Sequence, residues 1–361
     1  MNSSRFEFSL ATEADDEQLR RRMAADWLRG HLSVSFRREP SYFAACAVQG
    51  ETSEVFCCRD RSTGSVVLMA SRSIRQAYVN GTPQRLGYIG DIRLAPEHRN
   101  GTLLGRAARY LRHLHEANPV PLYFAVILDG NQAALSAFTM PRAGVPVLTE
   151  WGRMLTPAIH LDLPRRKVSE AGISFEMARP DQSQEIVVFL SRSHAEKQFA
   201  PCVASLKNLP DFLLAIRNNQ IVGCCAGWDQ RAFRQTHIEE YSLGLTLLRP
   251  LYNLAAALSP LKPLPAPGSA IPYLYLSHVA VEDNDPRIFR ALLAEFYRRY
   301  RRGPWHYVIA GLHERDPLAS VLHDYRRIEA AGRLFAVHYE DGAAALAKLD
   351  GRVPYIEMAT V

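Results

Sequence analysis

Long apolar runs are missing from this sequence of 361 residues. No uncharged stretch reaches the roughly 18 to 20 residues of a transmembrane helix, and the opening MNSSRFEFSL lacks the apolar core of a secretory signal peptide. No HExxH motif, nucleophile elbow or Walker phosphate loop occurs either. We therefore expect a cytoplasmic protein without a transmembrane segment, and hydrolytic, metal-dependent and nucleoside-triphosphate chemistry have no support.

Cysteine is also scarce, and its six positions show no CxxC spacing. Cys57 and Cys58 lie in one apolar strand-like run, and Cys224 and Cys225 lie in another. Neighbouring side chains of a strand point to opposite faces of the sheet. We expect buried, reduced thiols and no metal site, with a metal or redox role as the alternative.

The charge distribution gives little sign of a polyanionic partner. The sequence has 43 Lys and Arg against 37 Asp and Glu, a net charge of +6 with a pI near 9.0. The basic residues are scattered, and they lack the interleaved aromatic residues of a single-strand binding groove. We therefore expect no nucleic-acid partner, although the basic excess is compatible with an anionic cofactor.

The most informative stretch runs from Leu86 to Leu114. A strand-like segment ends near Pro96, a polar loop follows, and apolar residues then recur at helical spacing from Leu103. The N-terminus of such a helix presents unpaired N–H groups and a positive dipole end, which suit a phosphate or pyrophosphate. The alternative is an ordinary strand-turn-helix unit of an α/β domain, because one glycine-bearing loop is a weak signal.

At Leu94, Pro96 and Arg99 this stretch resembles the GNAT superfamily of acyl-CoA N-acyltransferases. Their fourth strand and loop read roughly aliphatic-x-Pro-x-x-Arg-Gly-x-Gly-x-Gly/Ala. Thr102 and Leu104 stand at the two glycine positions. The resemblance implies that the strand pairs with the pantetheine arm of acetyl-CoA or another acyl-CoA and that the loop cradles its pyrophosphate. The cofactor-binding residues so implied are Ile92, Arg93, Leu94, Arg99, Asn100, Gly101, Thr102, Leu103, Leu104 and Gly105.

A second part of the resemblance follows the apolar strand at 121–128. The family has an Asn-x-x-Ala-x-x-aliphatic-Tyr signature there, and here Asn131 matches while Phe138 stands at the tyrosine position. The resemblance adds both residues to the cofactor site. That tyrosine commonly protonates the departing thiolate. Phe138 cannot, but a thiol pKa of about 8.5 makes the thiolate a tolerable leaving group.

Two side chains are candidates for the catalytic chemistry. Transfer to an amine needs a proton acceptor near the nucleophile. Asp91 lies three residues before Leu94, where related enzymes that acylate small amines have an acidic residue. The alternative is a carboxylate that is solvated or paired to Arg93 or Arg75. Tyr88 is the weaker candidate, for ordering the substrate, and packing is its alternative role.

The chain reads as two domains, residues 1–167 and 168–361, joined by the linker PRRKVSEAG. A closing strand at 151–163 precedes the linker, and the second half repeats the order of elements, including one apolar strand at 305–312. The resemblance implies an α/β (α+β) fold of two consecutive GNAT-like domains, each with a mixed, mostly antiparallel sheet flanked by helices. In the second half, His278 stands at the position of Asp91.

The second cofactor loop is degenerate. It reads Glu-Asp-Asn-Asp-Pro at 282–286, without the arginine or a glycine, and three carboxylates would oppose a pyrophosphate. His278, with His313 and Glu314, forms either an acid–base site for a ligand presented across the interface or hydrogen-bonded structural histidines. An apolar, proline-rich insertion at 242–272 has three alternative interpretations. It is a surface segment folded onto the domain, an apolar wall for an acyl chain or a cover over the interdomain cleft, or a membrane-surface element.

The sequence therefore predicts an acyl-CoA-dependent N-acyltransferase whose first half transfers an acetyl or longer acyl group to a primary amine of a small molecule or peptide. The alternative is a non-catalytic protein in which Thr102, Leu104 and Phe138 mark decay of the first site and both halves keep the fold for binding.

Overall fold

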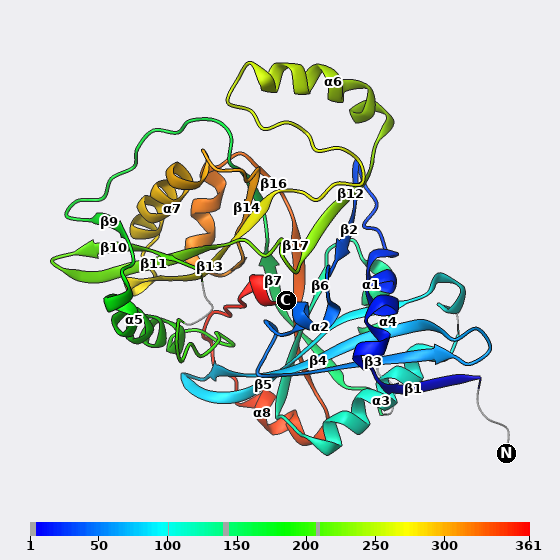
Figure 1. The fold of residues 1–361 in the computed structure, drawn as a ribbon. Helices are drawn as coiled ribbons and strands as arrows, with labels where there is room; N and C mark the ends of the chain where they lie inside the picture. Colours follow the sequence, from blue (N-terminus) through cyan, green and yellow to red (C-terminus); the bar gives the residue numbers. More distant parts are fainter. Residues whose placement is uncertain (1–4, 100, 140–143, 207–209) are drawn as a thin grey trace.

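The computed structural model describes residues 5–99, 101–139, 144–206 and 210–361. Its strands form two large mixed sheets and one two-stranded ribbon, with helices packed around them (Figure 1). Most neighbouring strands are antiparallel, and each large sheet contains one parallel pair. The expected α/β architecture, two mixed and mostly antiparallel sheets flanked by helices, is therefore confirmed.

The first sheet has eight strands and is built around a long hairpin. Asn80 and Gly81 form the hairpin turn with φ of 52° and 79°, the left-handed conformation that an Asn-Gly turn supplies. The strands in sheet order are β1 (Phe6–Leu10), β3 (Thr52–Asp60), β4 (Ser65–Val79), β5 (Thr82–Leu94), β6 (Leu122–Leu128), β17 (Ala331–His338), β7 (Val147–Leu155) and β15 (Leu312–His313).

The second sheet has seven strands, and a separate ribbon lies beside the first half. The strands of the second sheet, in order, are β16 (Arg327–Ile328), β8 (Ala158–His160), β14 (Tyr307–Ile309), β13 (Tyr273–Val281), β11 (Gln220–Trp228), β10 (Phe212–Arg217) and β9 (Ser174–Met177). The ribbon pairs β2 (Leu32–Arg37) from the first half of the chain with β12 (Gln235–Tyr241) from the second.

The two halves exchange strands. β17 comes from the end of the chain and lies between β6 and β7 of the first sheet. β8 precedes the linker and pairs with β14 of the second sheet. The sequence did not reveal this exchange, because a strand's own pattern does not identify its neighbours. The boundary near residue 168 remains a prediction.

Two expected strands are each divided between the sheets. The closing strand predicted at 151–163 is wrong as one element: β7 ends at Leu155, and β8 begins at Ala158 in the other sheet. Pro157, which has no N–H for a sheet ladder, lies at this break. The strand predicted at 305–312 likewise divides into β14 and β15 at Gly311, where a Cβ would lie 2.3 Å from Met358 Cγ.

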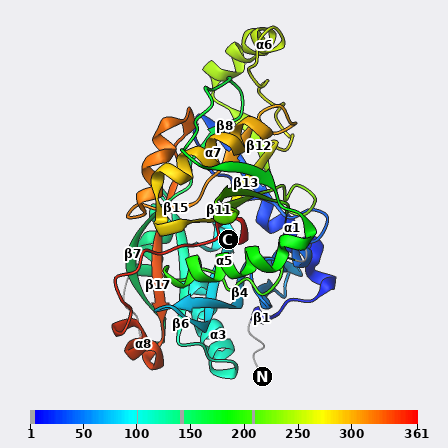
Figure 2. The same ribbon diagram turned by 90° about the vertical axis from the view of Figure 1, so that its left-hand side faces the viewer.

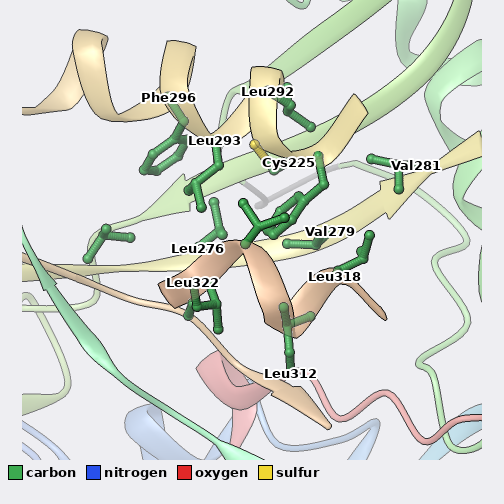
Figure 3. Packing of buried hydrophobic residues seen from close by; sticks show 14 of the residues in the cluster. Cys225, Leu276, Val279, Val281, Leu292, Leu293, Phe296, Leu312, Leu318 and Leu322 are labelled. Carbon is green, nitrogen blue, oxygen red and sulfur yellow. The ribbon is translucent and has the colours of Figure 1, made fainter. Parts of the chain in front are cut away.

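The helices and their cores follow the predicted amphipathic pattern. The buried side chains of α3 at Leu103, Ala107, Leu111 and Leu114 belong to the core of the first sheet. In the second half, α7 packs its leucines against β13 and the short helix η5 (Figure 3). The helices are α1 (Asp16–Ala24), α2 (Tyr42–Cys46), α3 (Leu103–Ala117), α4 (Gln132–Thr139), α5 (Ser183–Ala195), α6 (Leu243–Ala257), α7 (Pro286–Tyr300) and α8 (Ala343–Ala347), with 3₁₀ helices η1 (Glu13–Asp15), η2 (Pro96–His98), η3 (Pro180–Gln182), η4 (Glu282–Asn284), η5 (Pro317–Asp324), η6 (Glu340–Gly342) and η7 (Met358–Thr360).

The last residues of the chain lie in the middle of the molecule. Figure 1 and Figure 2 both place the C-terminal end near the centre, between the two large sheets. Ala359 and Thr360 of η7 are buried there. Among the described residues, no helix is long and apolar enough to cross a bilayer. The six cysteines are free, and five of them are buried.

Candidate functional site

The site begins where β5 and β6 separate. The two strands pair in parallel only from Leu86 to Tyr88, although β5 continues to Leu94 and β6 to Leu128. A bulge in β5 accompanies the separation: the register with β4 shifts between Met69 and Ser71, and Asp91 has a φ of 51°. A bulge bends its strand and increases its twist. The far ends of β5 and β6 therefore border an opening.

This opening is part of a pocket of about 1100 Å³. Trp27, Leu28 and Phe36 of the first half form one side, and Ala319, Leu322 and Arg327 of the second half contribute another. No pattern in the sequence indicated that these distant segments meet. The expected cofactor residues that line the pocket are Ile92, Arg93, Leu94, Arg99, Leu104, Asn131 and Phe138.

Not every expected cofactor residue lines the pocket. Asn100 lies outside the described residues. Gly101, Thr102, Leu103 and Gly105 are absent from the pocket wall within the described chain. The side chain of Leu103 is buried in the core, so only its main chain can face a ligand.

The N-terminus of α3 has room in front of it. Thr102 is the N-cap with φ of −90° and ψ of 0°, values open to any residue, and its side chain makes no capping hydrogen bond. A Cβ on Gly105 would meet no heavy atom within 4 Å. Neither position therefore requires glycine for steric reasons inside the protein, and Thr102, one of the two departures from the family pattern, does not distort the loop.

Two arginines add positive charge to the pocket. Arg99 is half exposed, and its Nη2 lies 3.2 Å from Asp26 Oδ1. Arg93 donates from Nη1 to the Ile92 carbonyl oxygen, and its buried Nε has no hydrogen-bond partner within the described part of the chain. Unsatisfied guanidinium donors favour an anionic ligand.

The second motif forms the start of a helix at the pocket wall. The Asn131 side-chain Oδ1 accepts a hydrogen bond from the Ala134 N–H at 3.1 Å, which caps the first turn of α4. Phe138 lies further along α4 and is half-buried against the core of the first sheet. Its ring lines the pocket but offers no proton.

Asp91 is a buried, charged member of the bulge. Tyr42 donates its hydroxyl hydrogen to Asp91 Oδ2 at 3.0 Å, and Arg38 Nη2 lies 3.5 Å from Oδ1. Burial alone would raise the Asp91 pKa, but the charges of Arg38, Arg93 and Arg234 outweigh burial and hold the pKa below its usual value. Asp91 is therefore ionised at neutral pH. The cation paired with it is Arg38, neither of the two partners anticipated from the sequence.

Tyr88 is placed for packing. Its ring stacks on Phe124 with centroids 4.9 Å apart. Its hydroxyl folds over Gly90, where a Cβ would lie 2.3 Å from that oxygen. Burial raises the pKa of Tyr88, so the phenol stays protonated. The glycine in the strand is thus explained by close approach of an aromatic side chain.

Three buried arginines surround Asp91 and the end of the chain. Arg234 donates to the main-chain oxygens of Ala45, Ala359 and Val361. Arg75 donates to Thr360 Oγ1 at 2.7 Å, and burial lowers the Arg75 pKa to about 10. With Arg38 they form a cluster that the sequence analysis missed. Its signal in the sequence is weak, because Arg75 lies in a strand that also contains Arg72, Gln76 and serines.

The second half contains the same bulge in a closed environment. β13 pairs in parallel with β14 only from Tyr273 to Tyr275, and His278 has a φ of 51°. Glu357 Oε2 accepts from the His278 N–H at 2.6 Å. The Tyr355 hydroxyl oxygen accepts from the Val279 N–H at 3.0 Å and donates to Glu357 Oε2 at 2.9 Å. The segment before η7 therefore occupies the opening of the second half.

The remaining second-half residues have structural partners. Burial lowers the His278 pKa to about 4. His313 shares a hydrogen bond with the Trp151 carbonyl oxygen at 2.9 Å. Lys197 Nζ donates to Asn284 Oδ1 of the acidic loop at 2.9 Å. It also donates to Oδ2 of Asp316, the N-cap of η5, at 2.7 Å. The degenerate loop is held by a lysine from outside the motif.

Within the residues that the structure describes, no group of three or more His, Cys, Asp or Glu side chains is arranged to hold a metal ion.

Comparison with known proteins agrees with this geometry at the level of the fold. No protein-family model and no curated protein matches the sequence. A GCN5-related N-acetyltransferase from Sphaerobacter thermophilus matches with a TM-score of 0.55 and 13% identity, and both chains are covered in full. A GCN5-related N-acetyltransferase from Anabaena variabilis matches with a TM-score of 0.53 and 10% identity over 92% of this chain and 72% of that one.

N-myristoyltransferase is also similar. The Saccharomyces cerevisiae enzyme with bound myristoyl-CoA and inhibitors gives a TM-score of 0.60 at 10% identity, over 99% of this chain and 87% of that one. The match therefore spans both halves. The family resemblance seen at Leu94, Pro96 and Arg99 is confirmed for the fold: this chain has the GNAT fold.

Proposed function

We propose that the protein is an acyl-CoA-dependent N-acyltransferase that uses its first half to transfer an acyl group to a primary amine of a small molecule or peptide. The observation that carries this proposal is the pocket in which the open end of β5, Arg93, Arg99 and the α4 wall meet. The equivalent opening in the second half is filled by Tyr355 and Glu357.

The pocket suits a cofactor of the size and charge of CoA. Its volume of about 1100 Å³ is slightly above the roughly 300 to 1000 Å³ typical of ligand sites. In the proposed complex the main chain of 92–94 pairs with the pantetheine arm. Arg99 and the N–H groups at the start of α3 bind the pyrophosphate. The pocket volume also leaves room for an acyl group longer than acetyl.

The reaction needs little covalent help from the protein. The amine nitrogen attacks the thioester carbonyl carbon, a C–N bond forms, and the C–S bond breaks. The amine loses a proton, and CoA leaves as a thiolate or takes that proton. Asp91, ionised at the bulge, is the proposed proton acceptor, directly or through water. Tyr88 is retained as the weaker candidate for ordering the substrate, although its ring is packed on Phe124. We place the activity in the cytoplasm, as the sequence predicts.

A specific observation supports the alternative of a non-catalytic binding protein. Both Asp91 oxygens already have partners, and Phe138 stands where an acid would be. Such a site could bind acyl-CoA without turning it over. Binding and turnover therefore have to be measured separately.

Calorimetry with acetyl-CoA and with a long-chain acyl-CoA tests the proposal. We expect micromolar binding of at least one donor and release of free CoA when a panel of primary amines is added. Binding without CoA release would favour the alternative. Failure of both donors to bind below millimolar concentration would overturn the transferase and leave the alternative, a non-catalytic protein that binds another ligand or a partner.

A further inference from the structure

Helix α6 exposes its apolar side and turns its polar side toward the protein. Six leucines in and just after the helix are between 58% and 85% exposed. On the other side, Asn253 Nδ2 donates to the Leu264 carbonyl oxygen at 3.1 Å, Asn253 Oδ1 accepts from the Leu264 N–H at 2.8 Å, and Arg249 Nε donates to the same carbonyl oxygen at 3.2 Å. The surface helix of a soluble protein normally has the opposite arrangement. The exposed leucines are Leu243, Leu247, Leu248, Leu251, Leu254 and Leu258.

The leucines form one stripe. Leu243, Leu247, Leu251, Leu254 and Leu258 follow one another at intervals of four, four, three and four residues, which keeps them on one helical face. Figure 1 and Figure 2 both show α6 projecting from the edge of the molecule, away from the two large sheets. No described part of the chain covers the stripe, as the exposure of its members shows.

The charges of the segment that carries this stripe have one sign, although Glu239 and Glu240 directly precede it. Residues 241–281 contain no Asp or Glu, and Arg249 and Lys262 are their only Lys or Arg. Lys262 Nζ donates to the Gly303 carbonyl oxygen at 2.8 Å, which holds the segment against the turn containing Arg301 and Arg302. The base of the apolar helix is therefore bordered by basic residues.

We propose that α6 binds the surface of an anionic phospholipid bilayer, with its leucines inserted among the acyl chains and its axis in the plane of the membrane. At 15 residues the helix is too short to span a bilayer. An exposed apolar face with nearby cations is the arrangement of an interfacial helix. Anionic headgroups attract each nearby Lys or Arg.

A second copy of the chain is the competing partner, and the charges disfavour it. Two α6 helices packed through their leucines would leave Arg249 and Lys262 of each copy without an acidic partner from the other segment. Helix pairs of this kind usually carry opposite charges beside the apolar seam. An anionic bilayer supplies the missing negative charge.

The anchoring of α6 places this surface next to the pocket wall. The Ser242 N–H donates to the His31 carbonyl oxygen at 2.8 Å, directly before β2. β2 carries Phe36, which lines the pocket, as do Trp27 and Leu28. Membrane binding does not depend on the proposed acyl transfer. Vesicle binding can therefore be measured without substrate, and its result is independent of whether the protein is a transferase.

Cosedimentation of the full chain with unilamellar vesicles tests the proposal. We expect binding to vesicles of equal parts phosphatidylcholine and phosphatidylglycerol, and weaker binding to phosphatidylcholine alone. Leu247→Glu/Leu251→Glu should weaken binding at least about tenfold, because both apolar insertion and charge attraction are reduced. Val188→Glu is the matched control: Val188 is 58% exposed on α5, and its variant should bind like the wild type.

Circular dichroism and thermal melting should show that both variants remain folded, since all three side chains are exposed. Wild type that stays in the supernatant with anionic vesicles overturns the proposal. Equal binding of wild type and Leu247→Glu/Leu251→Glu also overturns it. A wild-type dimer that becomes monomeric in this double variant, with no vesicle binding by either, assigns the stripe to a second copy instead.

Discussion

β5 and β13 have the same local shape and opposite surroundings. Each pairs in parallel with its neighbour over three residues, and each then bulges at a residue with a φ of 51°. Beyond Asp91, β5 borders an open pocket, whereas the main chain beyond His278 is bonded to Glu357 and Tyr355. The same backbone therefore borders an open pocket or a closed core, depending on the segment that packs over it.

The two bulge residues also differ in charge. Neighbouring arginines keep Asp91 ionised despite its burial. Glu357 Oε2 lies 3.8 Å from His278 Nδ1, but burial lowers the His278 pKa to about 4, so the imidazole is neutral at physiological pH. A buried charge is maintained only where its partners compensate for the loss of solvation. The first bulge therefore holds an ionised carboxylate, and the second holds a neutral, packed imidazole.

The largest expected effect comes from removing the charge of the first bulge. Asp91→Asn should lower kcat/KM by about 10²- to 10⁴-fold if Asp91 accepts the proton. The same change leaves buried Arg38 without its carboxylate. This should lower the free energy of unfolding by about 3 to 5 kcal/mol. Steady-state kinetics with an accepted amine and chemical denaturation measure the two effects.

Arg38→Met/Asp91→Asn separates the two roles. The double variant removes both charges and should recover most of the lost stability, as buried ion pairs replaced by apolar groups often do. The asparagine introduced at position 91 can still accept the Tyr42 hydroxyl hydrogen. Activity that stays low in a stable double variant supports a catalytic role; activity that returns with stability would show that Asp91 serves only to pair Arg38.

A smaller effect is expected from the second bulge, on stability alone. The folded-state pKa of His278 is about 4, below the 6.5 of an unperturbed histidine. Between these values the unfolded state binds a proton and the folded state does not, so stability falls as the pH drops from 6.5 to 4. His278→Asn keeps a residue that tolerates positive φ and should reduce this fall by up to about 3 kcal/mol.

Denaturant unfolding at several pH values measures that change. The exposed His113→Asn is the control and should leave the pH profile of the wild type intact. Buried His194 also has a pKa lowered to about 4, so some acid sensitivity will persist in His278→Asn. An unchanged profile would mean that His278 is not held neutral by burial. CoA binding should be unaffected in every case.

The smallest effect is expected at the cofactor loop. Arg99 is 55% exposed and already near Asp26, so Arg99→Ala should weaken CoA binding by only about three- to tenfold. Pro286→Ala, at the equivalent place in the second half, should leave the affinity unchanged. Calorimetry compares the two variants, and equal losses would contradict the assignment of the cofactor to the first half.

The sequence predicted the parts of the site that are local. Leu94, Pro96 and Arg99 lie in one strand-loop-helix unit, and α3 begins at Leu103 as its spacing indicates. The fold class was implied by the family resemblance at these residues and by the order of the elements that follow them. The roles of the site residues, including Asp91, remain predictions.

The missed features all depend on segments far apart in the chain. They are the pocket wall from Ala319 to Arg327, the Arg38 partner of Asp91, and the filling of the second opening by Tyr355. Local periodicity carries no information about such neighbours. The exposed side of α6 was visible as an apolar run, but the direction in which it faces was not.

The exchange of β8 and β17 makes the two halves depend on each other during folding. β17 supplies the strand between β6 and β7. During synthesis the first half would therefore present unpaired strand edges until the last 31 residues, which include β17, were made. Closing this pairing joins segments about 200 residues apart, and such non-local contacts form slowly. Synthesis of the N-terminal half should therefore be followed by a period in which the chain needs protection from aggregation, and severing the linker should not release two self-sufficient proteins.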